Sequence, residues 1–227
     1  MDLGYLATIF PSIFDGLIFT LIFWMIVFVI SMATSIGLSM LDGLGNDSIS
    51  KIISAYTGLI RGTPLLFQMY FVYFGLPILF GLRIDNLQSA YLAFIISWVA
   101  YLTETLRGAI SSVEKGQKDA AQVLGLSKFQ TMFYVVLPQA VSSAMPSITN
   151  QAVSLVYGTS ILSVLGLDDI LKAARIAVIR DLRLEGFLIA GAFYILFNSL
   201  VIFVFKKLEK YFSRYKFNEY SPNLKIK

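Results

Sequence analysis

The sequence contains neither cysteine nor histidine among its 227 residues. Disulfide bonds, thiolate or imidazole metal ligands, cysteine nucleophiles and histidine general bases are therefore excluded. A glycine-rich phosphate-binding loop of the G-x-x-x-x-G-K-S/T type is also absent, so the chain lacks that machinery for hydrolysing nucleotides. We therefore expect a protein that is not an enzyme and that holds no metal or cofactor of its own.

Charge is scarce, because only 14% of residues are charged while 57% are hydrophobic; a soluble domain carries about a quarter charged residues. About 20 apolar residues cross a hydrocarbon core of ~30 Å, and backbone in lipid must satisfy its own hydrogen bonds, which favours helices. We expect an all-α membrane protein, a single membrane domain over residues 1–227 with five transmembrane helices. Charges are absent from residues 16–41, 62–82, 86–103, 129–167 and 186–205, and the expected spans are about 16–41, 55–80, 86–106, 147–167 and 186–206.

The fourth uncharged stretch is too long for one span and contains Pro138 and Pro146. We expect its first part to lie on the membrane surface, with Pro138 ending a short helix there, and residues 147–167 to cross. No Lys or Arg precedes the first apolar run, which argues against a cleaved secretory signal. Thr63 and Pro64 are expected to cap and begin a helix.

Lys and Arg are distributed unevenly between the two sides that five spans create. Thirteen of the 18 fall on the side of the C-terminus, several of them in a basic tail that includes Lys216, Lys225 and Lys227. Because cytoplasmic loops carry the excess of positive charge, we expect the N-terminus outside and the C-terminus in the cytoplasm. Residues 115–138 would then face the cytoplasm, and residues 168–185 would form a solvated helical loop outside. Anionic membrane lipid accounts for the net charge of +4, and no nucleic acid is needed.

The cytoplasmic segment is the most informative part of the sequence. Residues 119–124 are mostly good helix formers and Gly125 follows, a residue suited to a left-handed helix cap. Ser127 can cap a second helix that starts at once. Two short helices meeting at a bend are expected, with Ala120 and Ala121 leaving a smooth surface that a partner could approach. An ordinary amphipathic helix-turn-helix at the membrane surface is the alternative.

Several short motifs lie before, within and after this segment along the chain. They are Arg61-Gly62-Thr63-Pro64-Leu65-Leu66, Tyr73-Phe74-Gly75-Leu76-Pro77, Ala100-Tyr101, Glu104, Arg107-Gly108, Asp119-Ala120-Ala121 with Gly125, Val135, Leu137-Pro138-Gln139-Ala140, Pro146, Asn150-Gln151 and Thr159-Ser160. Together, over roughly residues 13–212, they resemble the permeases of ABC importers with an EAA loop and a MetI-like fold. Within that class they look like the polar amino acid uptake branch, which includes histidine, glutamine, arginine and cystine permeases.

The resemblance implies a function and a set of partners. The chain would be a permease subunit in a prokaryotic cytoplasmic membrane, paired with an identical or similar permease copy. A partner ABC ATPase would bind ATP and Mg²⁺, and an extracytoplasmic solute-binding protein would deliver the substrate. The residues expected to contact the ATPase are Asp119, Ala120, Ala121, Gly125 and Leu126. Asp119 replaces the Glu usual in the family, and Tyr157-Gly158 stands where the family often has Lys-Asp.

Three groups of residues are candidates for a substrate path or gate. Glu104 can form an i,i+3 ion pair with Arg107, although it could also meet a cationic substrate. An aromatic ridge with Gln68 beside it could line the path or merely pack; it consists of Phe67, Tyr70 and Phe74. Polar residues at helical spacing form a stripe that must face protein or a water-filled cavity: Ser143, Ser147, Asn150, Ser154 and Tyr157.

Other functions remain open at this point. Within the same class, the solute could be an opine or a modified amino acid. A self-sufficient channel or secondary transporter is a second alternative, although no repeat or intramembrane carboxylate relay supports ion coupling.

Overall fold

The computed structural model describes residues 3–215, so the basic tail residues Lys216, Lys225 and Lys227 lie outside the described part. Within it all regular structure is helical, which confirms the predicted fold class. The elements are α1 (Leu3–Gly43), α2 (Asp47–Arg61), α3 (Leu65–Tyr70), a π-helical turn (Phe71–Gly75), α4 (Leu76–Phe80), α5 (Asn86–Ser112), α6 (Lys115–Val123), α7 (Lys128–Gln130), a second π-helical turn (Thr131–Val136), α8 (Leu137–Gly158), a 3₁₀ helix (Thr159–Leu165), α9 (Ile170–Asp181), α10 (Glu185–Phe212) and a terminal 3₁₀ turn (Ser213–Tyr215).

Four helices in the described residues are long and apolar enough to cross a membrane: α1, α5, the continuous helix Lys128–Leu165, and α10. A fifth candidate is α2 taken together with Leu65–Phe80, two helices that meet at an angle of 101°. Four or five candidate spans therefore agree with the expected number. The expected span over residues 55–80 is not one straight helix, because the chain turns sharply at residues 62–64.

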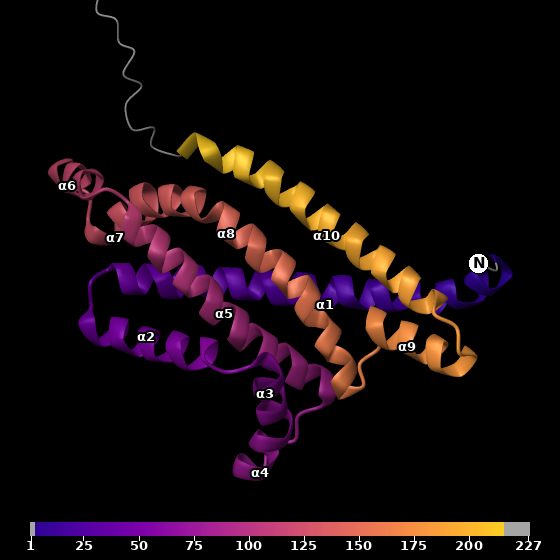
Figure 1. Ribbon diagram of the computed structural model, residues 1–227. Helices are drawn as coiled ribbons and strands as arrows, with labels where there is room; N and C mark the ends of the chain where they lie inside the picture. Colours follow the sequence, from indigo (N-terminus) through magenta and orange to yellow (C-terminus); the bar gives the residue numbers. More distant parts are fainter. Residues whose placement is uncertain (1–2, 216–227) are drawn as a thin grey trace, which may run out of the picture.

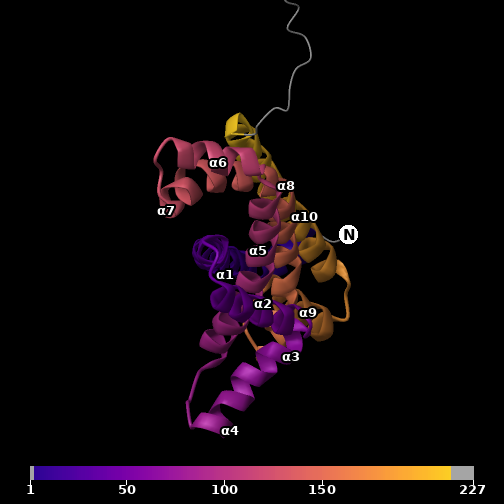
Figure 2. The same ribbon diagram turned by 90° about the vertical axis from the view of Figure 1, so that its left-hand side faces the viewer.

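The long helix α1 organises the bundle. Its 41 residues correspond to about 60 Å, twice the thickness of a hydrocarbon core. Figure 1 shows α5, α8 and α10 crossing along it, with α6 and α7 at one end of the bundle and α9 at the other. Figure 2, turned by 90°, shows α6 and α7 on one side of α1, and α3 and α4 projecting on another. The two predicted extramembrane segments thus lie at opposite ends.

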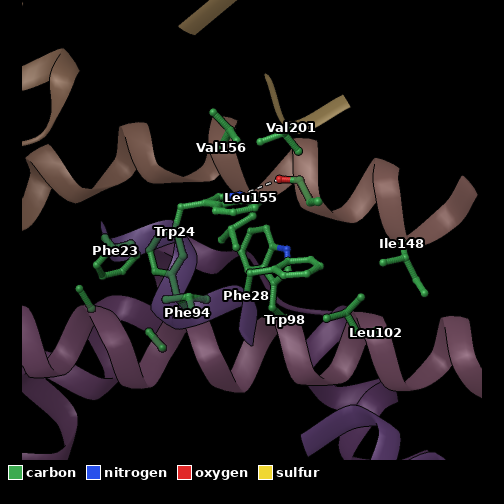
Figure 3. Close-up of a cluster of buried hydrophobic side chains, with 14 of the residues drawn as sticks. Phe23, Trp24, Phe28, Phe94, Trp98, Leu102, Ile148, Leu155, Val156 and Val201 are labelled. Carbon is green, nitrogen blue, oxygen red and sulfur yellow. Dashed lines mark hydrogen bonds between the residues drawn. The ribbon is translucent and has the colours of Figure 1, made fainter. Parts of the chain in front are cut away.

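Aromatic side chains dominate the main core, where α1, α5, α8 and α10 meet (Figure 3). Phe23 packs edge-on against Phe94 with ring centroids 5.0 Å apart. Both tryptophans turn their indole N–H groups onto α8: Trp24 donates to the Ala152 carbonyl at 2.9 Å, and Trp98 donates to the Gln151 carbonyl at 3.1 Å. A buried indole that finds an acceptor keeps its large apolar area inside at no polar cost.

The role predicted for Pro138 is wrong. The helix does not stop there but runs from Lys128 to Leu165 without a break, so residues 129–146 do not form a separate helix. Pro138 lies in the first turn of α8, directly after the π-helical turn Thr131–Val136. Because proline lacks an N–H and its ring crowds the carbonyl four residues earlier, a wider turn at this point lets the helix continue.

Thr63 does not cap α3, contrary to expectation. Pro64 occupies the cap position and no side chain bonds to the first backbone N–H groups of α3. The Thr63 hydroxyl instead donates backwards to the carbonyls of Leu59 and Ile60, at 3.3 and 3.1 Å. The sequence Gly62-Thr63-Pro64 therefore ends α2 and forms the sharp turn, and it supplies no side-chain cap to α3.

The segment 168–185 is helical, as expected, but it is not solvated on all sides. Ile170, Ala174 and Ala177 of α9 are buried with Ile9 and Ile13 of α1. Gly16 of α1 is where the two backbones meet, because a Cβ there would lie 2.9 Å from the Asp169 carbonyl oxygen. The segment is therefore docked on the bundle.

Candidate functional site

The bend between α6 and α7 has the geometry predicted from its local sequence. Gly125 has φ +83°, a left-handed conformation that favours glycine. The N–H of Leu126 donates to the Ala121 carbonyl and that of Gly125 to the Gln122 carbonyl, which is the hydrogen-bond pattern of a Schellman cap. Ser127 then caps α7, forming a capping box with Gln130. We call α6, α7 and their connection the elbow, residues 115–130.

The elbow exposes most, but not all, of the residues expected to contact a partner. Asp119 and Ala120 are exposed, and Leu126 is half-buried, but Ala121 is only 4% exposed and faces the protein. The expectation that Ala121 offers its side chain to a partner is therefore wrong for this conformation, because α6 packs its inner face on the bundle. Two apolar residues that the sequence reading missed are almost fully exposed: Val123 (87%) and Leu124 (81%). The sequence pattern that could have predicted this exposed apolar pair is two consecutive apolar residues directly before a capping glycine, at the end of an otherwise polar helix.

The predicted polar stripe lies along one exposed face of α8. Asn150, Ser154 and Tyr157 are all exposed, and so are Ser143 and Ser147 one and two turns earlier. The opposite face of α8 carries the buried residues of the aromatic core, including Ile148 and Leu155. Lipid disfavours polar side chains, so this face needs protein or water against it.

Gly158 comes directly after this stripe and explains a departure in the sequence. A Cβ at Gly158 would lie 2.9 Å from Cη2 of Trp98, so the Trp98 ring occupies the space into which a side chain would project. An aspartate, the residue often found at this position in similar permeases, would require the ring to move. The Trp98 indole therefore fits against the helix because residue 158 is a glycine.

The charged residues near the C-terminal end of α5 form a network. Glu104 pairs with Arg107 at 3.3 Å, which confirms the predicted i,i+3 ion pair, and it accepts a hydrogen bond from the Thr57 hydroxyl at 3.2 Å. Arg107 also binds Asp42 at 2.9 Å, and Arg61 lies 3.7 Å from Glu104. The network joins the ends of α1, α2 and α5, and Glu104 keeps 39% of its side chain exposed.

Gln68 and Tyr70 occupy different environments although they are two residues apart. Gln68 is 8% exposed, and its Nε2 donates to the carbonyls of Ile60 and Thr63 at 2.8 and 3.0 Å. This amide therefore holds the sharp turn between α2 and α3. Tyr70 is 41% exposed and packs near Phe74. Among the described residues, no hydrogen bond or ion pair joins Gln68 or Glu104 to the α8 stripe.

At the other end of the bundle, α9 carries a buried carboxylate. Asp169 is fully buried and caps α9 by accepting from the N–H groups of Leu171 and Lys172. Burial raises the pKa of Asp169 to about 6, although these backbone N–H groups oppose the shift. At the far end of α9, the hydrogen bond from the exposed Arg180 lowers the pKa of Asp181 to about 2.

The comparisons with known proteins identify the kind of protein that carries these features. A family model described as "Binding-protein-dependent transport system inner membrane component" matches residues 3–214. The chain belongs to this family. Binding-protein-dependent inner membrane components are transporter permease subunits of ABC importers and not enzymes, so the chain is an integral, multi-pass membrane protein of that class. The resemblance drawn from the sequence is thereby confirmed.

Named members of the family are similar along almost the whole chain. The arginine transport system permease protein ArtQ of Bacillus subtilis (strain 168) is 35% identical over 213 residues, covering 92% of this chain and 97% of ArtQ. The glutamine transport system permease protein GlnP of Escherichia coli (strain K12) is 31% identical over 190 residues, covering 81% and 87%.

Solved structures of ABC transporters share the fold. A crystal structure of an amino acid ABC transporter with histidines matches with a TM-score of 0.79 and 30% identity, covering 94% of this chain and 98% of the other. An inward-facing structure of the MetNI methionine ABC transporter also has a TM-score of 0.79, covering 93% and 99% of the two chains at 14% identity. The second match supports the fold alone.

Proposed function

We propose that this chain is one of two membrane-spanning subunits of an ATP-driven importer for polar amino acids. Its support is the arginine and glutamine permeases at 31–35% identity, together with the order of family motifs in the sequence. We place the N-terminus outside and the C-terminus in the cytoplasm, with the elbow inside and α9 outside, in a prokaryotic cytoplasmic membrane. This orientation rests on the distribution of Lys and Arg.

The observation that carries the proposal is the apolar tip of the elbow. Val123 and Leu124 are 87% and 81% exposed on a helix whose end is held by a complete Schellman cap. A rigid, exposed apolar tip is typical of a site that a partner covers. The partner we propose is the ABC ATPase, which would hold ATP and Mg²⁺. The docking face would consist of Asp119, Ala120, Val123 and Leu124, with Gly125 and Leu126 shaping the turn behind it.

The exposed polar stripe on α8 supports a second permease copy, identical or similar. In lipid, Asn150, Ser154 and Tyr157 would lose hydrogen bonds that water supplies. A second copy facing this stripe would enclose it in a path for a polar solute. An extracytoplasmic binding protein would then deliver the solute at the α9 end.

Leu124→Asp in the assembled transporter tests ATPase docking. A carboxylate buried against the partner costs several kcal/mol unless it is paired, so copurification of the ATPase and ATP-dependent uptake should both fall more than tenfold. Leu182→Asp is the matched control, because Leu182 is 90% exposed at the opposite end of the bundle and its φ of +52° suits aspartate. If Leu124→Asp copurifies with as much ATPase as the control variant does, the proposal is wrong.

Glu104 is proposed as a structural and gating residue rather than a binding site for cationic substrates. Its carboxylate is engaged by Thr57 and Arg107, with Arg61 also within 4 Å. Glu104→Gln should therefore reduce uptake of neutral and cationic amino acids in the same proportion, measured by competition in proteoliposomes. Selective loss of arginine and lysine uptake would instead show that Glu104 contacts the substrate.

A further inference from the structure

A small cavity lies between the elbow and the turn at the end of α1. Its volume is about 240 Å³, and it is lined by the turn Gly43–Gly45 together with Lys118 and Gln122 of α6, and Lys128 and Thr131 of the next helix. Lys118, Gln122 and Ala121 share the inner face of α6, whereas the proposed ATPase-docking residues lie on the outer face. The cavity is therefore separate from the docking tip.

The cavity is basic. Lys118 and Lys128 both line it, and the lining residues include no aspartate or glutamate. Among residues 3–215, neither lysine has a carboxylate partner within 4.0 Å, in contrast to Arg61 and Arg107 nearby. Two ammonium groups without carboxylate partners can both bind an anion that enters the cavity.

The surroundings favour a ligand with an apolar part. The cavity lies just beyond the uncharged run 16–41 of α1, at the end of the bundle that we propose to face the cytoplasm. On the neighbouring face of the Lys128 helix, Phe129 and Phe133 stack with centroids 6.2 Å apart and are 58% and 46% exposed. An ammonium pair beside exposed aromatic rings at the end of a span matches the interface between lipid headgroups and acyl chains.

We propose that this cavity binds a phosphate group, either that of an anionic phospholipid headgroup or free phosphate. Lysine ammonium groups bind phosphate as point charges with three donors each. A phosphate held here bridges the α1–α2 turn to both arms of the elbow. It would hold the elbow at a fixed angle to the membrane domain.

Native mass spectrometry of the purified permease with its partner subunits, titrated with phosphatidylglycerol, tests the lipid source. With about 1 kcal/mol per lysine near a lipid surface, the double variant Lys118→Gln/Lys128→Gln should weaken retention of phosphatidylglycerol on the order of thirtyfold. Lys51→Gln/Lys115→Gln is the matched control, since it removes the same charge from two exposed lysines outside the cavity.

The same complex in phosphatidylcholine nanodiscs, melted with and without inorganic phosphate, tests the free ion. If phosphate raises the melting temperature and the double lysine variant abolishes this rise, the site binds free phosphate. If phosphate causes no rise but phosphatidylglycerol is retained tightly, the site binds lipid. Equal loss in the lysine variant and its control, or no loss in either assay, would overturn the proposal. So would a zero-length carbodiimide cross-link between Lys118 or Lys128 and an ATPase carboxylate, because a partner side chain would then fill the cavity.

Discussion

Replacing Gly16 by alanine tests the close approach of α1 and α9. Alanine in the middle of a helix normally stabilises it by up to about 1 kcal/mol relative to glycine. At Gly16, however, the new Cβ would lie 2.9 Å from the Asp169 carbonyl oxygen and 3.1 Å from the Ile170 Cα. These are backbone atoms at the start of α9, and they cannot rotate away as a side chain can.

The net effect depends on the balance of two terms. Crowding a packed site costs about 1–3 kcal/mol, which outweighs the gain in helix propensity. We expect a net destabilisation of about 1–2 kcal/mol, or roughly 2–8 °C in melting temperature for a chain of this size. Gly37→Ala is the control, because a Cβ at Gly37 meets nothing within 4 Å; it should leave stability unchanged or raise it.

Intrinsic fluorescence of the purified full chain in detergent gives the measurement. The chain has two tryptophans, and both indoles bond to α8 in the core, so unfolding of the bundle should change their emission. A melting temperature of Gly16→Ala equal to or above that of Gly37→Ala would refute the reasoning. It would mean that α9 can move off α1 at little cost.

Three further predictions concern single side chains. The pKa of buried Asp169 is about 6, above the value near 4 of an unfolded aspartate, so between these pH values the folded state binds the proton more tightly than the unfolded state. The stability of the protein should therefore fall as the pH rises from 4 to 6. If a pH series of melting temperatures shows the same slope for Asp169→Asn, the assignment to Asp169 is wrong. Gly158→Ala should lower the melting temperature by a few degrees and shift the emission of Trp98, whose ring lies 2.9 Å from the new Cβ; unchanged emission would exclude the contact. Arg107→Gln leaves the Asp42 carboxylate without its partner at 2.9 Å, so it should lower the free energy of unfolding by about 2 kcal/mol or more in denaturant titrations. Glu104→Gln should lower it clearly less. Equal losses in the two variants would argue against the network.

Features that depend on neighbouring residues in the chain could be predicted. Gly125 and Ser127 were assigned as caps from their types and spacing, and the structure has both, because caps are made by hydrogen bonds over three to five residues. The i,i+3 pair of Glu104 with Arg107 is local in the same sense. The alignment of polar residues on α8 is a consequence of helical periodicity alone.

Features that depend on tertiary contacts could not be predicted. The charges of residues 168–185 indicated a solvated loop, yet Asp169 is fully buried because α9 docks on α1 at a glycine 153 positions earlier in the chain. Asp42 and Thr57 joined the Glu104 network from α1 and α2, which no local pattern reveals. The prediction that Pro138 ends a helix is wrong because the widened turn before it relieves the clash between the proline ring and the carbonyl four residues earlier.

The unbroken stretch of α1 from Gly16 to Gly43 touches both ends of the molecule. Its first residue meets the backbone of α9, and its last packs against Met132 below the elbow. Sharp kinks in helices usually occur at proline, and the only proline of α1, Pro11, lies outside the stretch. A tilt of this stretch at its α9 end is therefore transmitted to its elbow end, so α1 mechanically couples the two ends of the bundle.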